Sequence, residues 1–269
     1  MEYLKDKNAG FIISDKKKKD IFISIFHLLK NSSSQINLTI NTNTLHIQGM
    51  DKSHICLFDS KLSFDWFEYY KVNKKYELCF DTGLFHSIIS TKGEDQSLVF
   101  YLEDDKNDSL IIELKTIENN CKKSDYNKYF KLPLFDYEYE EMVIPNTDYD
   151  AEFTLPSKKV TDMLSQLSNF GDDINIKCSN DCVNFKTLGN SVEMRVDIPV
   201  DDMNSYSIVE DEEVNLTYSL NYISKMCITN KLSSDIEFCL SNECPMKINY
   251  TLGDNSLLMF YIAPKLADE

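Results

Sequence analysis

The sequence predicts an α+β protein that contains two copies of one unit, each with two helices and several strands. One constant offset in numbering aligns two apolar stripes at helical spacing, namely Phe22, Ile25, Phe26 and Leu29 with Val160, Met163, Leu164 and Leu167. The same offset aligns residues that alternate as in strands, namely Ile36, Leu38, Leu45 and Ile47 with Ile174, Ile176, Val183 and Phe185. Because no gap interrupts the match, we interpret it as an internal repeat.

The later part of each copy repeats with a second, slightly smaller offset. The aligned positions are Phe80, Leu84, Phe100, Leu102 and Ile112 with Leu216, Leu220, Ile236, Phe238 and Ile248. Between the copies lies a segment too acidic for a core strand, with Asp136, Glu138, Glu140 and Glu141. We interpret it as an exposed connector pinned by Leu134, Met142 and Ile144. The predicted organisation is an N-terminal domain (1–131), a connector (132–148) and a C-terminal domain (149–269).

The elements of the first copy follow in order. A strand is expected over Gly10–Ile13, and Ser14 or Asp15 can cap a helix that runs to about Lys30. A half-buried strand follows at Ile36–Ile40. The segment Leu45–Leu62 predicts two short strands joined by a polar corner, since Gly49 and the sequence Asp-Lys-Ser supply turn chemistry.

Three further helices are expected, over about 81–91, 158–169 and 219–229. Two segments, Leu110–Lys115 and Ser191–Val196, are predicted to be edge strands at opposite ends of the protomer. An exposed strand edge leaves backbone groups unpaired and can pair with another chain.

Composition limits the class of protein. Hydrophobic residues make up 42% of the chain, which is enough for a core, and no apolar run is long enough to span a membrane. The N-terminus lacks the plan of a signal peptide, so we expect an intracellular protein. The cysteine pairs 178/182 and 239/244 do not have zinc-site spacing, and we interpret them as reduced thiols. The sequence predicts no metal and no cofactor.

The formal net charge is −16. An acidic chain is a poor general ligand for nucleic acid, because Lys and Arg supply the affinity for phosphate. Net charge is a sum over the whole surface, however, so a local basic face can coexist with an acidic exterior. Composition alone leaves both alternatives open.

Three segments in order carry a family signature. They are the corner Met50-Asp51-Lys52-Ser53-His54, the connector end Met142-Val143-Ile144-Pro145 and the tail Ile262-Ala263-Pro264-Lys265. This trio resembles the proliferating cell nuclear antigen (PCNA) family of DNA sliding clamps over nearly the whole chain. The resemblance implies the DNA clamp fold, with outer β-sheets and four inner helices per chain, and three chains that close into a ring.

The resemblance also implies where partners bind. The positions expected to form a pocket for a partner's peptide, which carries one aliphatic and two aromatic anchors, are Met50, His54, Ile55, Leu57, Met142, Ile144, Pro145, Pro245, Tyr261, Ala263 and Pro264. The subunit interface is expected at Leu110, Ile112 and Leu114 on one edge and at Ser191, Glu193 and Arg195 on the other.

The expected DNA-facing helices are less basic than those of the family. The remaining candidates for contact with phosphate are Lys17, Lys92, Lys158, Lys159 and Lys225. Neutral or acidic residues such as Asp20, Ser24 and Asp162 occupy other positions on these faces. These departures suggest a divergent member of the family, from a large DNA virus or a protist.

The sequence offers little for catalysis. It contains no Gly-rich phosphate loop, no G-x-S-x-G and no H-E-x-x-H motif. The carboxylates at 138–141 and 148–150 are interpreted as a solvated face, and His54 as a wall of the pocket, because no convergent set of polar groups can be assembled.

We therefore expect a non-enzymatic processivity factor that encircles duplex DNA and tethers DNA polymerase, a clamp loader and other proteins with the family's peptide motif. It is expected to be a homotrimer without membrane association, in the nucleus or in a viral replication compartment. The alternative is a clamp-fold scaffold, of the checkpoint or transcriptional kind, that binds partners without encircling DNA.

Overall fold

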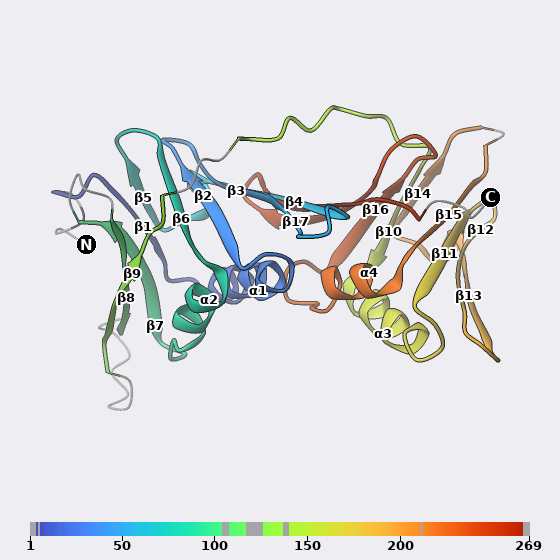
Figure 1. Cartoon of the computed structure of the whole chain (residues 1–269), viewed down its shortest axis with the longest axis horizontal. Coiled ribbons are helices and arrows are strands. Elements are labelled where there is room, and N and C mark those ends of the chain that lie inside the picture. Colours follow the sequence, from blue (N-terminus) through green and yellow to red (C-terminus); the bar gives the residue numbers. More distant parts are fainter. Residues whose placement is uncertain are drawn as a thin grey trace. The chain divides into compact units, whose positions relative to one another are not determined.

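The structure is a computed structural model that describes residues 4, 6–103, 108–116, 126–136, 140–210 and 212–265. The chain divides into two compact units (Figure 1). Unit 1 comprises Met1–Gly49, Asp59–Met142 and Leu252–Leu257, and unit 2 comprises Met50–Phe58, Val143–Thr251 and Leu258–Glu269. The change between units at Met142 and Val143 falls inside the predicted connector. Of the connector's predicted carboxylates, Glu138 lies outside the described residues.

Unit 1 contains an antiparallel sheet with the strand order β5-β1-β7-β8-β9. The strands are β1 (Ala9–Ile13), β5 (Tyr69–Val72), β7 (Gln96–Leu102), β8 (Ser109–Thr116) and β9 (Lys128–Pro133). Further strands follow the order β4-β3-β2-β6, with β2 (Gln35–Ile40), β3 (Thr44–Met50), β4 (Cys56–Ser63) and β6 (Tyr76–Asp81). A short 3₁₀ turn, η2 (Phe64–Trp66), follows β4.

Two helices cover the core of unit 1, α1 (Lys16–Ser32) and α2 (Thr82–Ser90). Each begins at an aspartate whose side chain accepts a backbone N–H: Asp15 from Lys18 at 2.8 Å and Asp81 from Leu84 at 2.6 Å. The predicted stripe of α1 is buried, and its Phe22 ring contacts Phe11, Phe26, Phe85, Phe100 and Trp66. The helix and its apolar stripe are thereby confirmed.

Unit 2 has the same plan. One group of strands follows the order β14-β10-β16-β17-β18, with β10 (Ala151–Pro156), β14 (Ser205–Ile208), β16 (Asp235–Leu240), β17 (Met246–Gly253) and β18 (Ser256–Ile262). A second sheet follows β13-β12-β11-β15, with β11 (Asp173–Cys178), β12 (Cys182–Leu188), β13 (Glu193–Pro199) and β15 (Val214–Ser219). The helices are α3 (Ser157–Leu167) and α4 (Leu220–Met226), and a 3₁₀ turn, η4 (Val200–Asp202), follows β13.

The internal repeat is confirmed by these elements. The offset that aligns Phe22 with Val160 carries α1 onto α3 and the pair β2 and β3 onto β11 and β12. The offset that aligns Phe80 with Leu216 carries α2 onto α4, and β7 and β8 onto β16 and β17. In each unit the two helices pack against each other, α1 with α2 and α3 with α4 (Figure 1). The predicted α+β class with two similar halves is therefore correct.

One predicted edge strand is wrong. The segment Leu110–Lys115 lies in β8, which pairs with β7 on one side and with β9 on the other. Its side chains Leu110, Ile112 and Leu114 are almost fully buried, as is typical of an interior strand. The edge is β9 instead, which is the last strand of the sheet and pairs with β8 among the described strands.

The second predicted edge strand, Ser191–Val196, is confirmed as an edge, but the strand begins two residues later than predicted. β13 is the last strand of its sheet and begins at Glu193, so Ser191 lies in the turn before it. Glu193 and Arg195 lie within the strand and are exposed.

Candidate functional site

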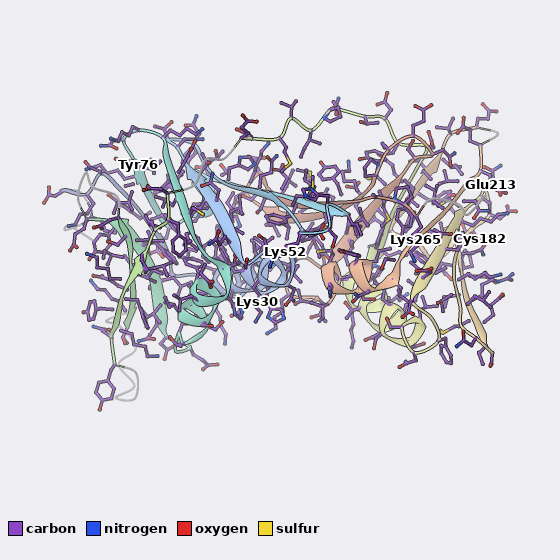
Figure 2. The ribbon with its side chains drawn as sticks, viewed as in Figure 1. Lys30, Lys52, Tyr76, Cys182, Glu213 and Lys265 are labelled. Atoms are coloured by element: carbon purple, nitrogen blue, oxygen red, sulfur yellow. The ribbon has the colours of Figure 1, made fainter. Side chains whose placement is uncertain are left out.

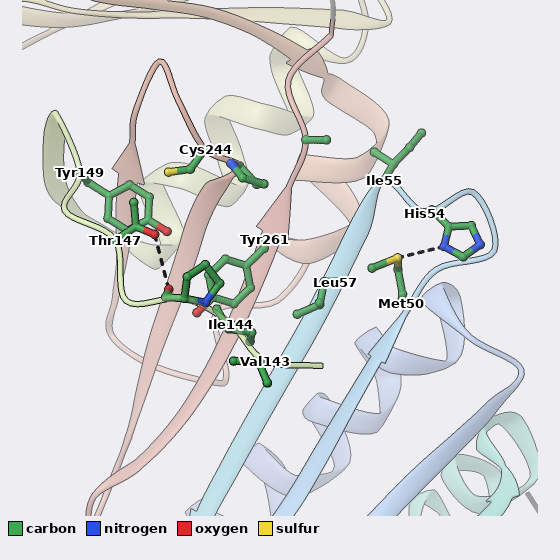
Figure 3. A pocket seen from close by; sticks show the side chains of 13 residues that line it. Met50, His54, Ile55, Leu57, Val143, Ile144, Thr147, Tyr149, Cys244 and Tyr261 are labelled. Atoms are coloured by element: carbon green, nitrogen blue, oxygen red, sulfur yellow. Dashed lines mark hydrogen bonds between the residues drawn. The ribbon is translucent and has the colours of Figure 1, made fainter. Parts of the chain in front are cut away.

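An apolar pocket lies within unit 2 and has a cavity volume of about 230 Å³ (Figure 3). It draws on the corner between β3 and β4, on the connector, on the loop before β17 and on the end of β18. The lining residues are Met50, His54, Ile55, Leu57, Val143, Ile144, Pro145, Thr147, Tyr149, Cys244, Pro245, Tyr261 and Ala263. A concave, mostly apolar site of this size suits a few side chains of a bound ligand.

All but two of the residues that were predicted to form the pocket are among its lining residues. Met142 and Pro264 are not among the lining residues. Four lining residues in loops were not predicted, Val143, Thr147, Tyr149 and Cys244. Sequence periodicity gives no direction for a side chain in a loop. Two of the four could have been indicated by their neighbours, since Val143 lies between Met142 and Ile144 and Cys244 precedes Pro245.

The corner between β3 and β4 is held by a buried carboxylate, Asp51. Its Oδ1 accepts the backbone N–H groups of Ile55 at 2.8 Å and Cys56 at 2.6 Å. Its Oδ2 accepts the N–H of Ser53 at 2.9 Å and the hydroxyl of Tyr222 at 3.0 Å. Burial alone would raise the pKa of Asp51, but these hydrogen bonds favour the charged form and lower the pKa below its ordinary value.

These four hydrogen bonds to the Asp51 carboxylate, together called the Asp51 clasp, fix the backbone of the corner. The side chains of this corner form the first wall of the pocket. His54 adopts a left-handed conformation with φ 56°, and its N–H donates to the carbonyl of Asp51 at 3.0 Å. Its ring Nδ1 lies 3.1 Å from the sulfur of Met50, which places both side chains at one side of the pocket (Figure 3). We conclude that Asp51, assigned only to a turn from the sequence, organises the corner.

The tail forms a second wall and is attached at both ends. The N–H of Ala263 donates to the carbonyl of Ile55 at 3.0 Å, and the N–H of Lys265 donates to the carbonyl of Thr217 at 2.7 Å. The ammonium of Lys265 (labelled in Figure 2) also pairs with Asp173. Pro264 between them has no N–H to satisfy, which suits an extended segment.

The connector is held within unit 1 just before it contributes to the pocket. The side-chain amide of Gln48 donates to the carbonyl of Met142 at 3.0 Å and accepts the N–H of Met142 at 2.8 Å. His46, two residues earlier on the same strand, lies between Asp59 and Glu141, at 2.5 and 3.6 Å. Met142 therefore anchors the connector through its backbone, and Val143 and Ile144 directly after it line the pocket.

The chemistry of the pocket is that of a binding site for apolar groups. Burial raises the pKa of Tyr149, so this phenol stays neutral, and the ammonium of Lys247 lies 4.7 Å from the centre of its ring. Burial likewise raises the pKa of the Cys244 thiol, which disfavours the reactive thiolate. Within the described ranges, no group of three or more His, Cys, Asp or Glu residues could hold a metal.

The lysines at the start of α1 differ in availability. Lys17 is exposed, whereas Lys18 pairs with Asp254 at 2.6 Å. Lys19 is buried, and its ammonium donates to the carbonyl of Gln96 at 2.7 Å; burial lowers its pKa. Lys16 is also exposed, with its ammonium 3.5 Å from Glu94. Of the predicted phosphate contacts, Lys17 is the one that this run leaves exposed.

Lys92 is less accessible than the other lysines predicted to contact phosphate. It lies after the end of α2, its side chain is only 12% exposed, and its ammonium pairs with Asp20 at 3.3 Å. In unit 2, Lys158 and Lys159 are exposed on the first turn of α3. Lys225 on α4 is partly covered, with its ammonium 5.9 Å from the ring of Tyr222.

The free edges of β9 and β13 can be assigned residue by residue. The N–H of Leu134 donates to the carbonyl of Asp108, so hydrogen-bonded pairs with β8 recur at every second residue. This register leaves the backbone groups of Tyr129 and Lys131 facing outward. In β13, the N–H of Val200 donates to the carbonyl of Asp181, so hydrogen-bonded pairs with β12 also recur at every second residue. This register leaves the backbone groups of residues 193, 195 and 197 facing the free side.

No described helix is long and apolar enough to cross a membrane. Comparison with protein families matches residues 15–141 to the PCNA N-terminal domain and residues 143–265 to the PCNA C-terminal domain.

Individual relatives match over almost their full length. PCNA of Chaetomium thermophilum is 29% identical over 259 residues, which cover 94% of this chain and 97% of that protein. PCNA 2 of Plasmodium falciparum is 26% identical over 254 residues, covering 92% and 96%. A crystal structure of PCNA from Entamoeba histolytica superposes with a TM-score of 0.84 at 22% identity, covering 97% of this chain and all of that chain, which supports the fold.

Proposed function

The chain belongs to the proliferating cell nuclear antigen family, and we propose how its own residues carry out the work of such a clamp. It is a DNA sliding clamp, a processivity factor for DNA polymerase. Clamps of this family are non-enzymatic scaffolds that encircle DNA and bind replication proteins. The alternative of a scaffold that does not encircle DNA is not favoured, because both halves of the chain match PCNA itself.

The pocket in unit 2 is proposed as the site for partner peptides. Its lining is apolar and aromatic, and it is open to solvent beside an extended connector segment. One aliphatic and two aromatic anchors from a short helical turn would bury apolar area there, which is the dominant gain in such recognition. Tyr261 and Ile144 are central among the lining residues, and the Asp51 clasp keeps the corner preformed, which lowers the ordering cost of binding.

We propose that subunits join through the free edges of β9 and β13. Each edge presents outward-facing backbone donors and acceptors, at Tyr129 and Lys131 on β9 and at Glu193 and Arg195 on β13. Pairing β9 of one subunit with β13 of the next would satisfy both edges and continue the sheet. Three such junctions would form a closed homotrimer, in agreement with the family's general assembly.

The proposed contacts with DNA are few. Exposed or partly exposed lysines on the helices are Lys17, Lys158, Lys159 and Lys225, and the acidic surface elsewhere repels the duplex. We infer that retention depends on ring closure and that direct attraction is weak. The proposed location is the nucleus, or a viral replication compartment if the chain is viral, with DNA polymerase and a clamp loader as partners.

Primer extension tests this function. On a long linear primed template, a ring can thread over a free end without a loader. A DNA polymerase that carries the family's peptide motif should then make longer products per binding event when the clamp is present. Unchanged product length across a range of clamp concentrations would contradict the proposal.

A further inference from the structure

The free edge of β13 carries charges of alternating sign. Arg195, the only arginine in the sequence, lies between Glu193 and Asp197, and all three side chains are exposed. The guanidinium of Arg195 donates to Asp197 from Nε at 3.1 Å and from Nη2 at 2.8 Å. The carboxylate of Glu193 pairs with Lys186 on the neighbouring strand β12 at 2.7 Å. Another strand that joins this edge meets a negative, a positive and a negative group in turn.

The free edge of β9 presents three side chains of different chemistry. Tyr129 and Lys131 lie on the exposed face of this strand, and Tyr129 is 62% exposed. Asn127 lies directly before the strand, and its side-chain oxygen accepts the N–H of Thr116 at 3.0 Å, so its amide nitrogen can donate elsewhere. Along the chain, this edge therefore offers an amide, an aromatic ring and an ammonium.

The backbone restricts how the two edges can pair. Outward-facing groups belong to residues 129 and 131 on β9 and to residues 193, 195 and 197 on β13, and the alternation of β9 continues to Asn127. The next outward-facing positions are Pro133 and Pro199, which have no N–H to donate. Each edge thus has three successive donors, and one antiparallel register pairs all three.

We propose that β9 of one subunit pairs with β13 of the next in this register. The residues that lie opposite each other are then Lys131 and Glu193, Tyr129 and Arg195, and Asn127 and Asp197. The inference rests on the proposed assembly through these edges and adds the register and the side chains that specify it. Both edge strands already pair antiparallel with their neighbours, which favours the same direction at the junction.

All three pairs are chemically complementary. Opposite residues of an antiparallel pair have their Cβ atoms about 4.5–5.5 Å apart on one face, so their side chains interact. The ammonium of Lys131 gives Glu193 a second cationic partner besides Lys186. The Tyr129 ring can stack on the guanidinium of Arg195, which stays planar and charged while it holds Asp197.

The other face of the junction supports the same alignment. Val196 and Ile198 line a cavity of about 250 Å³ together with Met163 of α3, so these side chains of β13 point to the helix side of their sheet. On β9, the ammonium of Lys128 donates to the carbonyl of Thr91 at the end of α2, so the same alternate positions point to a helix. The proposed register therefore keeps the helices of both subunits on one side of the continued sheet.

A shift of the strands by two residues loses this complementarity. In one direction Lys131 lies opposite Arg195, and like charges directly opposite each other destabilise a sheet. The same shift places Pro133 opposite Glu193, where one backbone donor is missing. In the other direction Lys131 lies opposite Ser191, in the turn before β13, and its charge has no opposite partner.

Charge exchange tests the register by sedimentation. Lys131→Glu and Glu193→Lys should each raise the subunit concentration at which the trimer half dissociates by about tenfold, since each of three junctions is weakened up to about fivefold. The variant with both changes should assemble nearly as wild type does. Lys131→Ala removes the attraction without adding repulsion, so its trimer should persist at concentrations where Lys131→Glu dissociates.

Glu213→Lys is the matched control (Glu213 is labelled in Figure 2). It reverses an exposed carboxylate that pairs with Lys177 at 2.9 Å, directly before β15 at the opposite edge of the same sheet. It should leave assembly unchanged and should not rescue Lys131→Glu. The two exchanged side chains are exposed, and circular dichroism checks that each variant is folded.

Three results would overturn the register. They are normal assembly of Lys131→Glu, tighter assembly of Lys131→Glu, as expected if Lys131 lay opposite Arg195, and rescue of Lys131→Glu by Asp197→Lys in place of Glu193→Lys. In each of these cases the wild-type trimer, and with it the proposed assembly, still stands. A wild type that stays monomeric would instead contradict the proposed assembly itself, so the two failures are distinguishable.

Discussion

The hydroxyl of Tyr222 on α4 donates a hydrogen bond of 3.0 Å to the carboxylate of Asp51 in the corner between β3 and β4. Asp51 is 7% exposed and also accepts three backbone N–H groups. One side chain therefore shapes the first wall of the peptide pocket and connects it to a helix of the same unit. This relationship leads to the first two predictions.

Asp51→Asn should destabilise the protein and weaken peptide binding. The amide group of asparagine has one accepting oxygen, so either the Ile55 and Cys56 bonds or the Ser53 and Tyr222 bonds are lost. Hydrogen bonds to charged groups contribute about 1.5–3 kcal/mol each, so the loss of two bonds should lower the free energy of unfolding by about 3 kcal/mol or more in chemical unfolding. Tyr222→Phe removes only one of the four bonds and should cost less. Equal stability of wild type and Asp51→Asn would contradict the role of the clasp.

The stability difference between wild type and Asp51→Asn should depend on pH. The pKa of Asp51 is lowered in the folded state, so its contribution is fully present above the unfolded value of about 3.9. It is lost as pH falls through the lower, folded value. Urea unfolding at pH 7 and at successively more acidic pH should show the difference shrinking. If the stability difference between wild type and Asp51→Asn instead widens on acidification, the folded state does not stabilise the charged carboxylate of Asp51.

Ile144→Ala and Tyr261→Ala should weaken binding of a peptide with the sequence Gln-x-x-aliphatic-x-x-aromatic-aromatic. Loss of a central anchor contact typically costs about 2 kcal/mol, which is roughly a thirtyfold rise in Kd. Both side chains are only partly buried, so the melting temperature should change little. Ile228→Ala is the matched control, since Ile228 is 51% exposed and outside the pocket. Calorimetric titration that finds one affinity for all four proteins would remove the pocket assignment.

Lys131→Pro should dissociate the trimer without unfolding the subunit. The N–H of Lys131 points to the free side of β9, so proline removes a donor from the edge and leaves the bonds to β8 in place. Lys131→Ala keeps the N–H and is the control for loss of the side chain. Sedimentation should show a smaller assembly for the proline variant only. If both variants sediment as wild type does, β9 is not the subunit edge.

Much of the fold follows from sequence periodicity. The stripe from Phe22 to Leu29 has helical spacing and a capping aspartate before it, so both its conformation and its buried face were predictable. The repeat of this stripe at Val160–Leu167 made the second half predictable from the first. A regular helix or strand buries the same side along its whole length. Its apolar residues therefore recur in the sequence at a fixed spacing that can be recognised.

Pairing between strands was less predictable. The sequence assigns the run Leu110–Leu114 to an edge although it is apolar at nearly every position, and the predicted boundary between domain and connector at 131/132 falls inside β9. Strand order depends on partners distant in sequence, which local pattern does not specify. The ion pair of Lys92 was unpredictable for a similar reason, since only the fold brings Asp20 to its ammonium. The loop residues Thr147 and Tyr149 in the pocket likewise depend on a backbone path without periodicity.

Retention on circular and linear duplex DNA tests the central claim most directly. After loading, the labelled clamp is followed on closed circles and on the same DNA cut once, over a series of salt concentrations. For B-DNA, the slope of log affinity against log salt concentration is about −0.9 for each phosphate that the protein neutralises. With few lysines on the helices, we predict long retention on circles, rapid loss from cut ends and a shallow dependence on salt. Tight binding that is equal on both forms and falls steeply with salt would contradict a clamp held by ring closure.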